Sequence, residues 1–182
     1  MSARRRNVVP DDAFGEMTSP RGSGADVDEI HDAVAERLGT NAIRYTKTRR
    51  RVVEVLARAR QPLTVDEIRT MTAAPLSSVY RTLAILEEVG LVHRLTNDNS
   101  EYARFELAED LLGHHHHLAC ASCGTMTDVT LPKNIEADLD RALALLAEQQ
   151  HFTVDGHRLD IIGTCATCTE TPRAQGETTR RA

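Results

Sequence analysis

The chain has 182 residues, of which 41% are hydrophobic, and its formal net charge is -5 at pH 7. This length and composition predict one ordinary domain or two small ones with packed cores. No apolar run approaches the roughly 18 residues of a membrane helix, and the arginines after Met1 lead into no apolar signal core. We therefore expect a cytoplasmic protein with no membrane partner, and the net charge argues against a uniformly basic nucleic-acid binder.

The charge is distributed unevenly along the chain. Residues 41–60 contain seven Lys/Arg against one acidic residue, whereas residues 101–160 contain eleven Asp/Glu against four Lys/Arg. This asymmetry suggests a phosphate-facing module joined to an acidic half, although a solvated basic helix face would give the same pattern. Residues 1–25 and 171–182 have little periodicity and are predicted to be disordered tails.

The first two predicted elements are helices, over Val27–Leu38 and Thr48–Ala59. The second helix has three arginines in its first turn, namely Arg49, Arg50 and Arg51. Positive charge at this end interacts unfavourably with the helix dipole, so an anionic partner is the simpler explanation for the cluster.

A pair of helices is predicted next. Thr64 and Glu67 have the spacing of a capping box, which opens a short helix that stops before Pro75. A second helix follows over residues 77–90, where serines are expected to cap the start and Gly90 to end it. Its apolar positions share one face: Val79, Leu83 and Leu86. Three other side chains point away from that face: Ser78, Tyr80 and Arg81.

Two alternating strands are predicted over Leu91–Leu95 and Glu101–Leu107, with a polar turn at Thr96–Ser100 between them. Short helix, turn, helix and hairpin is the order of a winged helix-turn-helix. In that arrangement the second helix of the pair lies in the major groove of DNA. Small helical domains with a hairpin also occur without DNA, so this pattern alone leaves both possibilities open.

All four cysteines fall into two Cys-x-x-Cys pairs, Cys120/Cys123 and Cys165/Cys168, with 41 residues between the pairs. Structural disulfides are not expected in a reducing cytosol, and two independent redox pairs are the main alternative. Four thiolates match the tetrahedral demand of a closed structural Zn²⁺ site. Such a site would connect the first strand of a larger domain to its carboxyl end.

Four consecutive histidines precede the first cysteine pair. If residues 113–120 form a strand, His114 and His116 lie on one side of it and His115 and His117 on the other. An artificial tag is the alternative, but the run is internal and only four residues long. The run therefore predicts two different metal sites that share one strand.

Each histidine pair needs further ligands, because one strand offers at most two to one ion. His93, on the face of Leu91 and Leu95, and Glu106, on the neighbouring strand, are candidates for one site. A hydrogen-bonded histidine and a surface carboxylate are the alternatives for these two residues.

Two candidates lie farther along the chain. Glu136 begins an amphipathic helix over residues 136–150, and His157 precedes a strand over residues 157–163. The helix is expected to face inward with its leucines: Leu139, Leu143 and Leu146.

Four segments resemble the ferric uptake regulator family of bacterial metal-dependent transcription factors. They are RYTKTRRRVVEVL (44–56), SSVYRTLAILEEVGLV (77–92), HHHHLACASCG (114–124) and GTCATC (163–168). The resemblance implies an α/β (α+β) fold, with a winged-helix DNA-binding domain over 26–108 and an α/β dimerisation domain over 109–170. It also implies a homodimer that binds a double-stranded DNA operator, usually as a metal-loaded repressor.

The resemblance extends to individual residues. It implies structural zinc ligands at Cys120, Cys123, Cys165 and Cys168, and it places the regulatory metal at His93, Glu106, His115 and His117. A second metal would bind to His114, His116, Glu136 and His157, and the DNA-contacting helix positions are Tyr80 and Arg81.

The sensed metal is less well defined by these matches. His93 resembles the zinc branch of the family, whereas the carboxylate Glu106 resembles iron and peroxide sensors, and His116 stands where many members have Asp. We expect a repressor of metal-uptake genes that binds structural Zn²⁺ and senses Zn²⁺, with an iron- or peroxide-responsive regulator that binds Fe²⁺ as the alternative. A metal-dependent hydrolase and a metal-storage protein are alternatives of another class. The chain has no His-Glu-x-x-His motif or nucleophile elbow, so we do not expect an enzyme.

Overall fold

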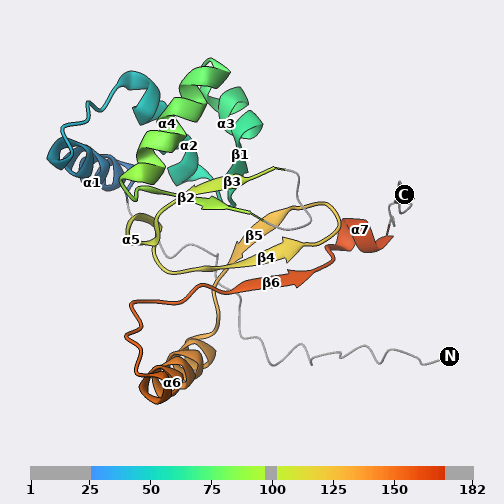
Figure 1. Ribbon diagram of the computed structural model, residues 1–182. Helices are drawn as coiled ribbons and strands as arrows, with labels where there is room; N and C mark the ends of the chain where they lie inside the picture. The colour runs from blue at the N-terminus through green and yellow to red at the C-terminus, as the bar shows by residue number, and fades with distance from the viewer. Residues whose placement is uncertain (1–25, 97–101, 171–182) are drawn as a thin grey trace, which may run out of the picture.

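The computed structural model describes residues 26–96 and 102–170, which form two α/β bodies, one above the other in Figure 1. The upper, N-terminal body contains four helices and a three-stranded sheet. The lower, C-terminal body contains a second three-stranded sheet, one long helix and a short one, and another short helix, at the boundary, packs on the N-terminal core through Leu111. The two predicted tails and most of the predicted turn at 96–100 lie outside the described residues. The predicted mixed α/β class is confirmed.

The N-terminal body is a helix-turn-helix with a hairpin. Its helices are α1 (Val27–Thr40), α2 (Lys47–Arg58), α3 (Val65–Thr72) and α4 (Leu76–Glu88). Its strands are β1 (Leu63–Thr64), β2 (Val92–Leu95) and β3 (Arg104–Leu107), which pair antiparallel in the order β1-β3-β2. The predicted apolar face of α4 is confirmed, since Val79, Leu83 and Leu86 are buried with residues of the other three helices in one core.

Local signals explain where these helices begin and end. The capping box of α3 is present: Thr64 Oγ1 accepts from Glu67 N at 3.3 Å, and Glu67 Oε2 accepts from Thr64 N at 2.6 Å. Gly90, with φ +69°, follows the end of α4 as predicted. The predicted serine cap is wrong, because α4 begins directly after Pro75, whose φ of -57° already suits a helix start. The first helix also runs past Gly39 to Thr40.

A buried histidine connects α1 to the start of α2. His31 is only 3% exposed, and its Nδ1 atom lies 2.6 Å from the hydroxyl of Tyr45. The guanidinium of Arg50 lies over the Tyr45 ring, 5.8 Å from its centroid. Burial, and then the charge of Arg50, lower the pKa of His31 below its usual value.

This histidine predicts a pH dependence of stability. Because the pKa of His31 is lower in the folded state, the unfolded chain binds more protons than the folded chain near pH 6.5. The stability that neutral His31 contributes is therefore complete above that pH and is lost as the pH falls. His31→Gln should flatten the slope, which for one group is at most about 1.4 kcal/mol per pH unit. Urea unfolding at pH 7.5 and 5.5 can be followed by tyrosine fluorescence. All three tyrosines lie in this body, and the chain has no tryptophan. An unchanged slope in His31→Gln, with exposed His93→Gln as control, would contradict this assignment.

The C-terminal body is built on β4 (His116–Cys120), which pairs antiparallel with β5 (Met126–Val129) and parallel with β6 (Asp160–Gly163). Its helices are α6 (Lys133–Gln150) and α7 (Ala166–Glu170), while α5 (Glu109–Leu112) leads from the hairpin to β4 and packs on the N-terminal core. A small apolar cluster joins the two bodies, because Leu95 of the hairpin is buried with Ala119 and Met126.

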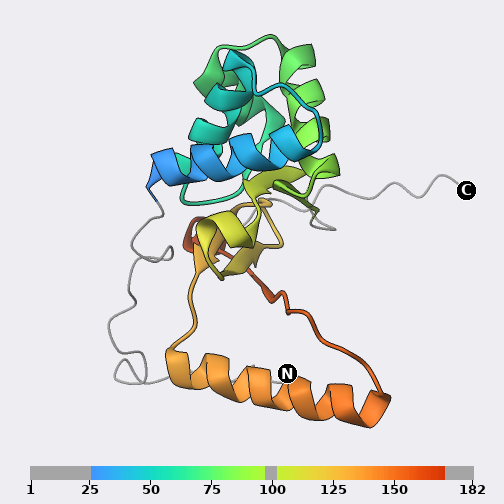
Figure 2. The ribbon, with the colours of Figure 1, turned by 90° about the vertical axis from the view of Figure 1, so that its left-hand side faces the viewer.

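Helix α6 stands away from the rest of the chain, as Figure 2 shows. It has no buried residue, and Leu146 is 54% exposed, so the predicted inward face is wrong for a single chain. Strand β6 is exposed along its whole length, with Ile162 67% exposed. One chain therefore leaves a large apolar surface uncovered. None of the described helices combines the length and apolar character needed to cross a membrane.

Candidate metal centres and DNA-facing surface

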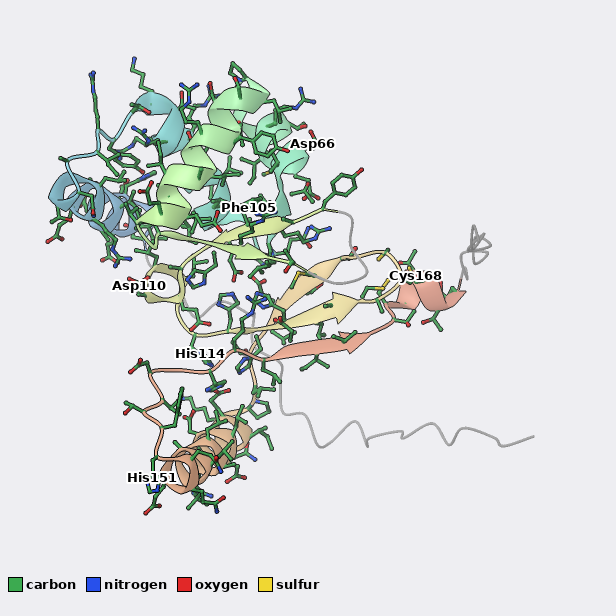
Figure 3. The ribbon with its side chains drawn as sticks, in the orientation of Figure 1. Asp66, Phe105, Asp110, His114, His151 and Cys168 are labelled. Carbon is green, nitrogen blue, oxygen red and sulfur yellow. The ribbon has the colours of Figure 1, made fainter. Side chains whose placement is uncertain are left out.

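The four cysteines converge at one end of the sheet, beside α7 in Figure 3, where Cys168 is labelled. Cys120 ends β4, Cys123 lies in the turn after it, and the second pair lies at the start of α7. None of the four forms a disulfide, and their sulfur atoms all lie within 4.8 Å of one another. Two sulfurs bound to one tetrahedral Zn²⁺ lie about 3.8 Å apart, and the Sγ atoms of Cys123 and Cys165 are 3.8 Å apart.

Backbone amides prepare this cluster for thiolate chemistry. The backbone N–H of Cys165 donates to the sulfur of Cys120 at 3.3 Å, and with other backbone donors it lowers the pKa of Cys120 to about 6. Because the thiolate is the form that binds a metal, this donor favours the ligating state. The geometry fits a closed four-sulfur zinc site and gives no support to two separate redox pairs.

A second cluster lies between the two bodies and is fully buried. It consists of Glu106 from β3 of the hairpin, His115 and His117 from the histidine run, and Asp128 from β5. Each of the four side chains belongs to a residue that is at most 4% exposed. The Nε2 atoms of His115 and His117 lie 3.2 and 3.1 Å from the same oxygen, Glu106 Oε2.

The other ring nitrogen of each histidine has a partner outside this cluster. The Nδ1 atom of His115 lies 2.9 Å from the Gly113 carbonyl oxygen, and that of His117 lies 3.1 Å from Asp160 Oδ1. Such contacts fix the ring orientation and direct Nε2 inward, as the outer partners of metal-bound histidines do. The residues therefore fit a metal site with two imidazole nitrogens and two carboxylates.

The electrostatics of this buried cluster are strongly coupled. Burial alone would raise the pKa of Glu106, but hydrogen bonds from His115 and His117 outweigh it, and the pKa falls to about 2. For His115 the directions are reversed. Burial alone would lower its pKa, but the hydrogen bonds with Glu106 and with the Gly113 carbonyl raise it. The cluster thus holds an ionised carboxylate and a readily protonated imidazole, and a divalent cation would replace the proton.

The structure does not bring His93 to this cluster. Glu106 and His93 are paired across β2 and β3, but the His93 side chain is exposed. It lines an open hollow together with His114, Glu136 and His157. The fourth member, Asp128, was not predicted. The register of β4 and β5 places it directly opposite His117. Pairing the strand of the histidine run with the strand that follows it would therefore have indicated Asp128 as a ligand.

A third cluster brings together the four residues predicted for a second metal. Glu136, from the first turn of α6, is surrounded by the Nε2 atoms of three histidines at 2.9 to 3.1 Å: His114, His116 and His157. The His114 label in Figure 3 marks this position. The Nε2 atom of His157 is buried without a hydrogen bond in the described part of the chain, although it lies 3.0 Å from Glu136. This donor set fits a transition metal.

Alternation along the strand separates the two histidine pairs. His114 and His116 face Glu136, whereas His115 and His117 face Glu106, as expected for a strand with a period of two. His114 also has an outer carboxylate, because its Nδ1 atom lies 3.1 Å from Glu109 Oε2. Burial would lower the pKa of His114, but the contacts with Glu109 and Glu136 raise it.

The predicted DNA-contacting residues lie within the first two turns of α2 and α4. Tyr80 is 55% exposed and Arg81 is exposed, while Ser78 is half-buried. Arg50 and Arg51 are exposed, but Arg49 is half-buried and donates to the carbonyl of Arg44. Four of the six side chains are therefore exposed, whereas Ser78 is half-buried and Arg49 is partly used within the chain.

Comparisons with known proteins agree with this arrangement. The model of the ferric uptake regulator family matches residues 40–162. The peroxide operon regulator of Bacillus subtilis is 29% identical over 147 residues, covering 78% of this chain and 94% of its own length. The ferric uptake regulation protein of Campylobacter upsaliensis is 28% identical over 138 residues, covering 72% of this chain and 83% of its own.

A solved structure shares the fold. The Helicobacter pylori ferric uptake regulator, described as having three functional metal-binding sites, superposes with a TM-score of 0.65 at 24% identity, covering 82% of this chain and 97% of that chain. The match confirms the predicted order of an N-terminal winged-helix body and a C-terminal α/β body. Since the family model spans well over half of the sequence, the chain belongs to the ferric uptake regulator family.

Proposed function

We propose that this protein is a homodimeric, metal-responsive repressor that binds an operator in double-stranded DNA. The observation that carries the proposal is the buried cluster of Glu106, His115, His117 and Asp128. Glu106 belongs to the hairpin of the N-terminal body, whereas the other three belong to the C-terminal body. An ion held by these four side chains would join the two bodies.

Among the described residues, the two bodies are also connected by the small cluster around Leu95 and by the contact of Arg104 with the Gly124 carbonyl. Moving a two-state equilibrium from 1:99 to 99:1 needs about 5.5 kcal/mol of differential affinity, which several metal-ligand bonds can supply. In a dimer this would fix the distance between two α4 helices, so that both reach the major groove of one operator.

The uncovered apolar surface of the C-terminal body supports the homodimer. Helix α6 has no buried residue, and Ile161 and Ile162 of the edge strand β6 are exposed. Soluble monomers seldom leave apolar patches of this extent uncovered. A second copy that packs on α6 and β6 would bury them and would place the two N-terminal bodies on the outside of the dimer.

The donor set supports a proposal for the ion that is sensed. The expectation of zinc depended on His93, which is exposed outside the cluster. Two imidazoles and two carboxylates, with no thiolate, form a mixed nitrogen and oxygen set that suits Fe²⁺. We propose Fe²⁺ as the regulatory ion. Zn²⁺ is the second candidate, because donor separations of 3.1 and 3.2 Å also suit four-coordinate zinc, whose ligands lie about 3.3 Å apart.

Operator binding by protein that retains only its cysteine-bound zinc tests the proposal. The protein is titrated separately with Fe²⁺ under anaerobic conditions, Zn²⁺ and Mn²⁺, and DNA affinity is measured at several salt concentrations. We expect Fe²⁺ to raise affinity by at least tenfold, with a logarithmic salt slope of about -0.9 for each phosphate neutralised. A response to Zn²⁺ at lower free concentration would favour the zinc regulator, and a DNA affinity that none of the three ions changes would refute metal sensing.

The salt dependence separates the proposal from a metal-storage protein. A storage protein would bind metal at the same clusters but would show no sequence-specific DNA affinity. The exposed residues Arg50, Arg51 and Arg81 support the DNA-binding alternative, because phosphate contacts supply most of the salt-dependent affinity. The fully buried cluster around Glu106 has no exposed ligand position, which also argues against a hydrolase there, because a hydrolase needs an open site for water.

A further inference from the structure

One arginine connects the cysteine cluster to the helix-turn-helix. Arg104 lies on β3 with a side chain that is only 13% exposed. Its Nε donates to the carbonyl oxygen of Gly124 in the C-terminal body at 3.0 Å. Its Nη1 donates to the carbonyl oxygen of Pro62 at 3.1 Å and lies 3.5 Å from Glu67 Oε2. The same guanidinium therefore contacts both bodies.

The contact in the C-terminal body is part of the cysteine turn. Gly124 directly follows Cys123, and its φ of +72° is one that glycine adopts readily. Its N–H donates to the carbonyl oxygen of Cys120 at 2.9 Å, and Cys120 N donates to Thr125 O at 2.8 Å. The position of the Gly124 carbonyl is thus determined by the turn that carries two of the four sulfurs.

The contacts in the N-terminal body control the start of α3. Glu67 is the acidic partner of the capping box, and its Oε2 atom accepts from both the N–H and the hydroxyl of Thr64. Thr64 is also paired with Arg104 across β1 and β3. Because α3 is the first helix of the helix-turn-helix and packs against α4, its orientation fixes that of α4.

Arg104 lies on the same strand as Glu106 of the buried metal cluster. Arg104 and Glu106 are two residues apart on β3, so they project from the same face of the strand, toward the C-terminal body. Leu95, paired with Arg104 across the hairpin, packs against Ala119 and Met126. The hairpin therefore meets the C-terminal body at three neighbouring points: a carboxylate, an apolar side chain and an arginine.

We propose that Arg104 is a positioning residue for DNA binding, which holds the helix-turn-helix at a fixed angle to the cysteine turn. Its consequence for DNA rests on the proposed function. The planar guanidinium presents donors in different directions and can span two carbonyl oxygens and a carboxylate, which a lysine ammonium at one point cannot. Arg104 thus makes the angle between the bodies depend on the shape of the cysteine turn as well as on the ion at Glu106.

The test compares three full-length variants. Arg104→Gln removes the guanidinium, and Arg104→Lys keeps the charge without the fork. Arg94→Gln is the matched control, because Arg94 is an exposed arginine on the neighbouring strand of the same hairpin. Two quantities are measured: amide hydrogen exchange over residues 120–126 and 64–72, and the free metal concentration that gives half-maximal operator binding.

In Arg104→Gln we expect exchange in both segments to rise by about threefold or more, and the half-maximal metal concentration to rise by about tenfold, the effect of one lost hydrogen bond to a charged group. Arg104→Lys should resemble Arg104→Gln at residues 120–126, and Arg94→Gln should leave exchange unchanged. Faster exchange confined to 64–72 would overturn the proposal and leave Arg104 a role within one body. Amide exchange over residues 120–126 at the wild-type rate in Arg104→Lys would overturn the proposal as well. Metal-independent operator binding by the wild type would instead refute the proposed function, without affecting the exchange result at 120–126.

Discussion

Replacing His115 by alanine should abolish metal-dependent DNA binding and leave the dimer intact. His115 is 2% exposed, and its Nε2 atom faces Glu106 of the other body. Loss of an outer partner of a metal ligand typically costs 10- to 100-fold in metal affinity, and loss of the ligand itself should cost at least about 100-fold. Its hydrogen-bond partners, Gly113 and Glu106, lie outside α6 and β6, so the surface proposed for dimerisation should be unchanged. Operator binding across a metal titration, with analytical ultracentrifugation for the dimer, measures both effects.

Two further variants decide which side chain completes the cluster. Asp128→Asn should weaken the metal response almost as strongly as His115→Ala, because Asp128 is buried opposite His117. His93→Ala should change it little, because His93 is exposed. The reverse order would support the ligand set predicted from the sequence, with His93 in place of Asp128. A monomeric or unfolded His115→Ala protein would show that this histidine has a structural role instead.

The histidine run illustrates how much of the site the sequence can predict. The period of two along a strand depends only on local backbone geometry, so the separation of His114 and His116 from His115 and His117 could be predicted from four adjacent letters. The convergence of the cysteines could be predicted for a similar reason. Two Cys-x-x-Cys turns supply the four thiolates of one tetrahedral site wherever the chain brings them together.

The fourth position of the buried cluster depended on tertiary structure. His93 and Glu106 are paired across the hairpin, so the sequence placed both near the same ion. In the folded chain Glu106 is buried, whereas the His93 side chain lines an open hollow. Asp128 could be predicted only from the pairing register of β4 and β5. Ala119 pairs with Met126, so His117, two residues earlier, pairs with Asp128, two residues later.

Long-range contacts account for the remaining differences. Periodicity correctly indicated an amphipathic helix near residues 136–150, but its apolar side remains exposed in one chain. Periodicity reports that a face will be covered, and it does not say by which chain. Arg104 was not predicted either, since its partners Gly124 and Glu67 are distant from it in the sequence and one of them offers only a backbone carbonyl.

Replacing Cys120 by serine should unfold the C-terminal body and dissociate the dimer while the N-terminal body stays folded. Structural zinc sites contribute about 10–16 kcal/mol of apparent binding free energy, which equals or exceeds the 5–15 kcal/mol stability of a typical domain. The apolar core that this body has of its own is small, with only Ala119 and Met126 joining Leu95 of the hairpin. The bound metal is therefore expected to supply most of the stability of the C-terminal body, because the burial of apolar side chains there is small.

The two bodies can be followed separately in this variant. Tyrosine fluorescence reports on the N-terminal body, where Tyr45, Tyr80 and Tyr102 all lie, and amide exchange of β4 and β5 reports on the other. Ser122→Ala, in the same turn but without a sulfur ligand, is the matched control and should retain one structural zinc per chain. A Cys120→Ser protein that remains dimeric, with protected β4 amides, would contradict a structural role for the cysteine cluster. Because β4 also carries His116 and His117, loss of this zinc should abolish both other clusters, whereas His115→Ala disturbs only one. The cysteine cluster would then be a precondition for sensing, and the buried histidine cluster would be the sensor.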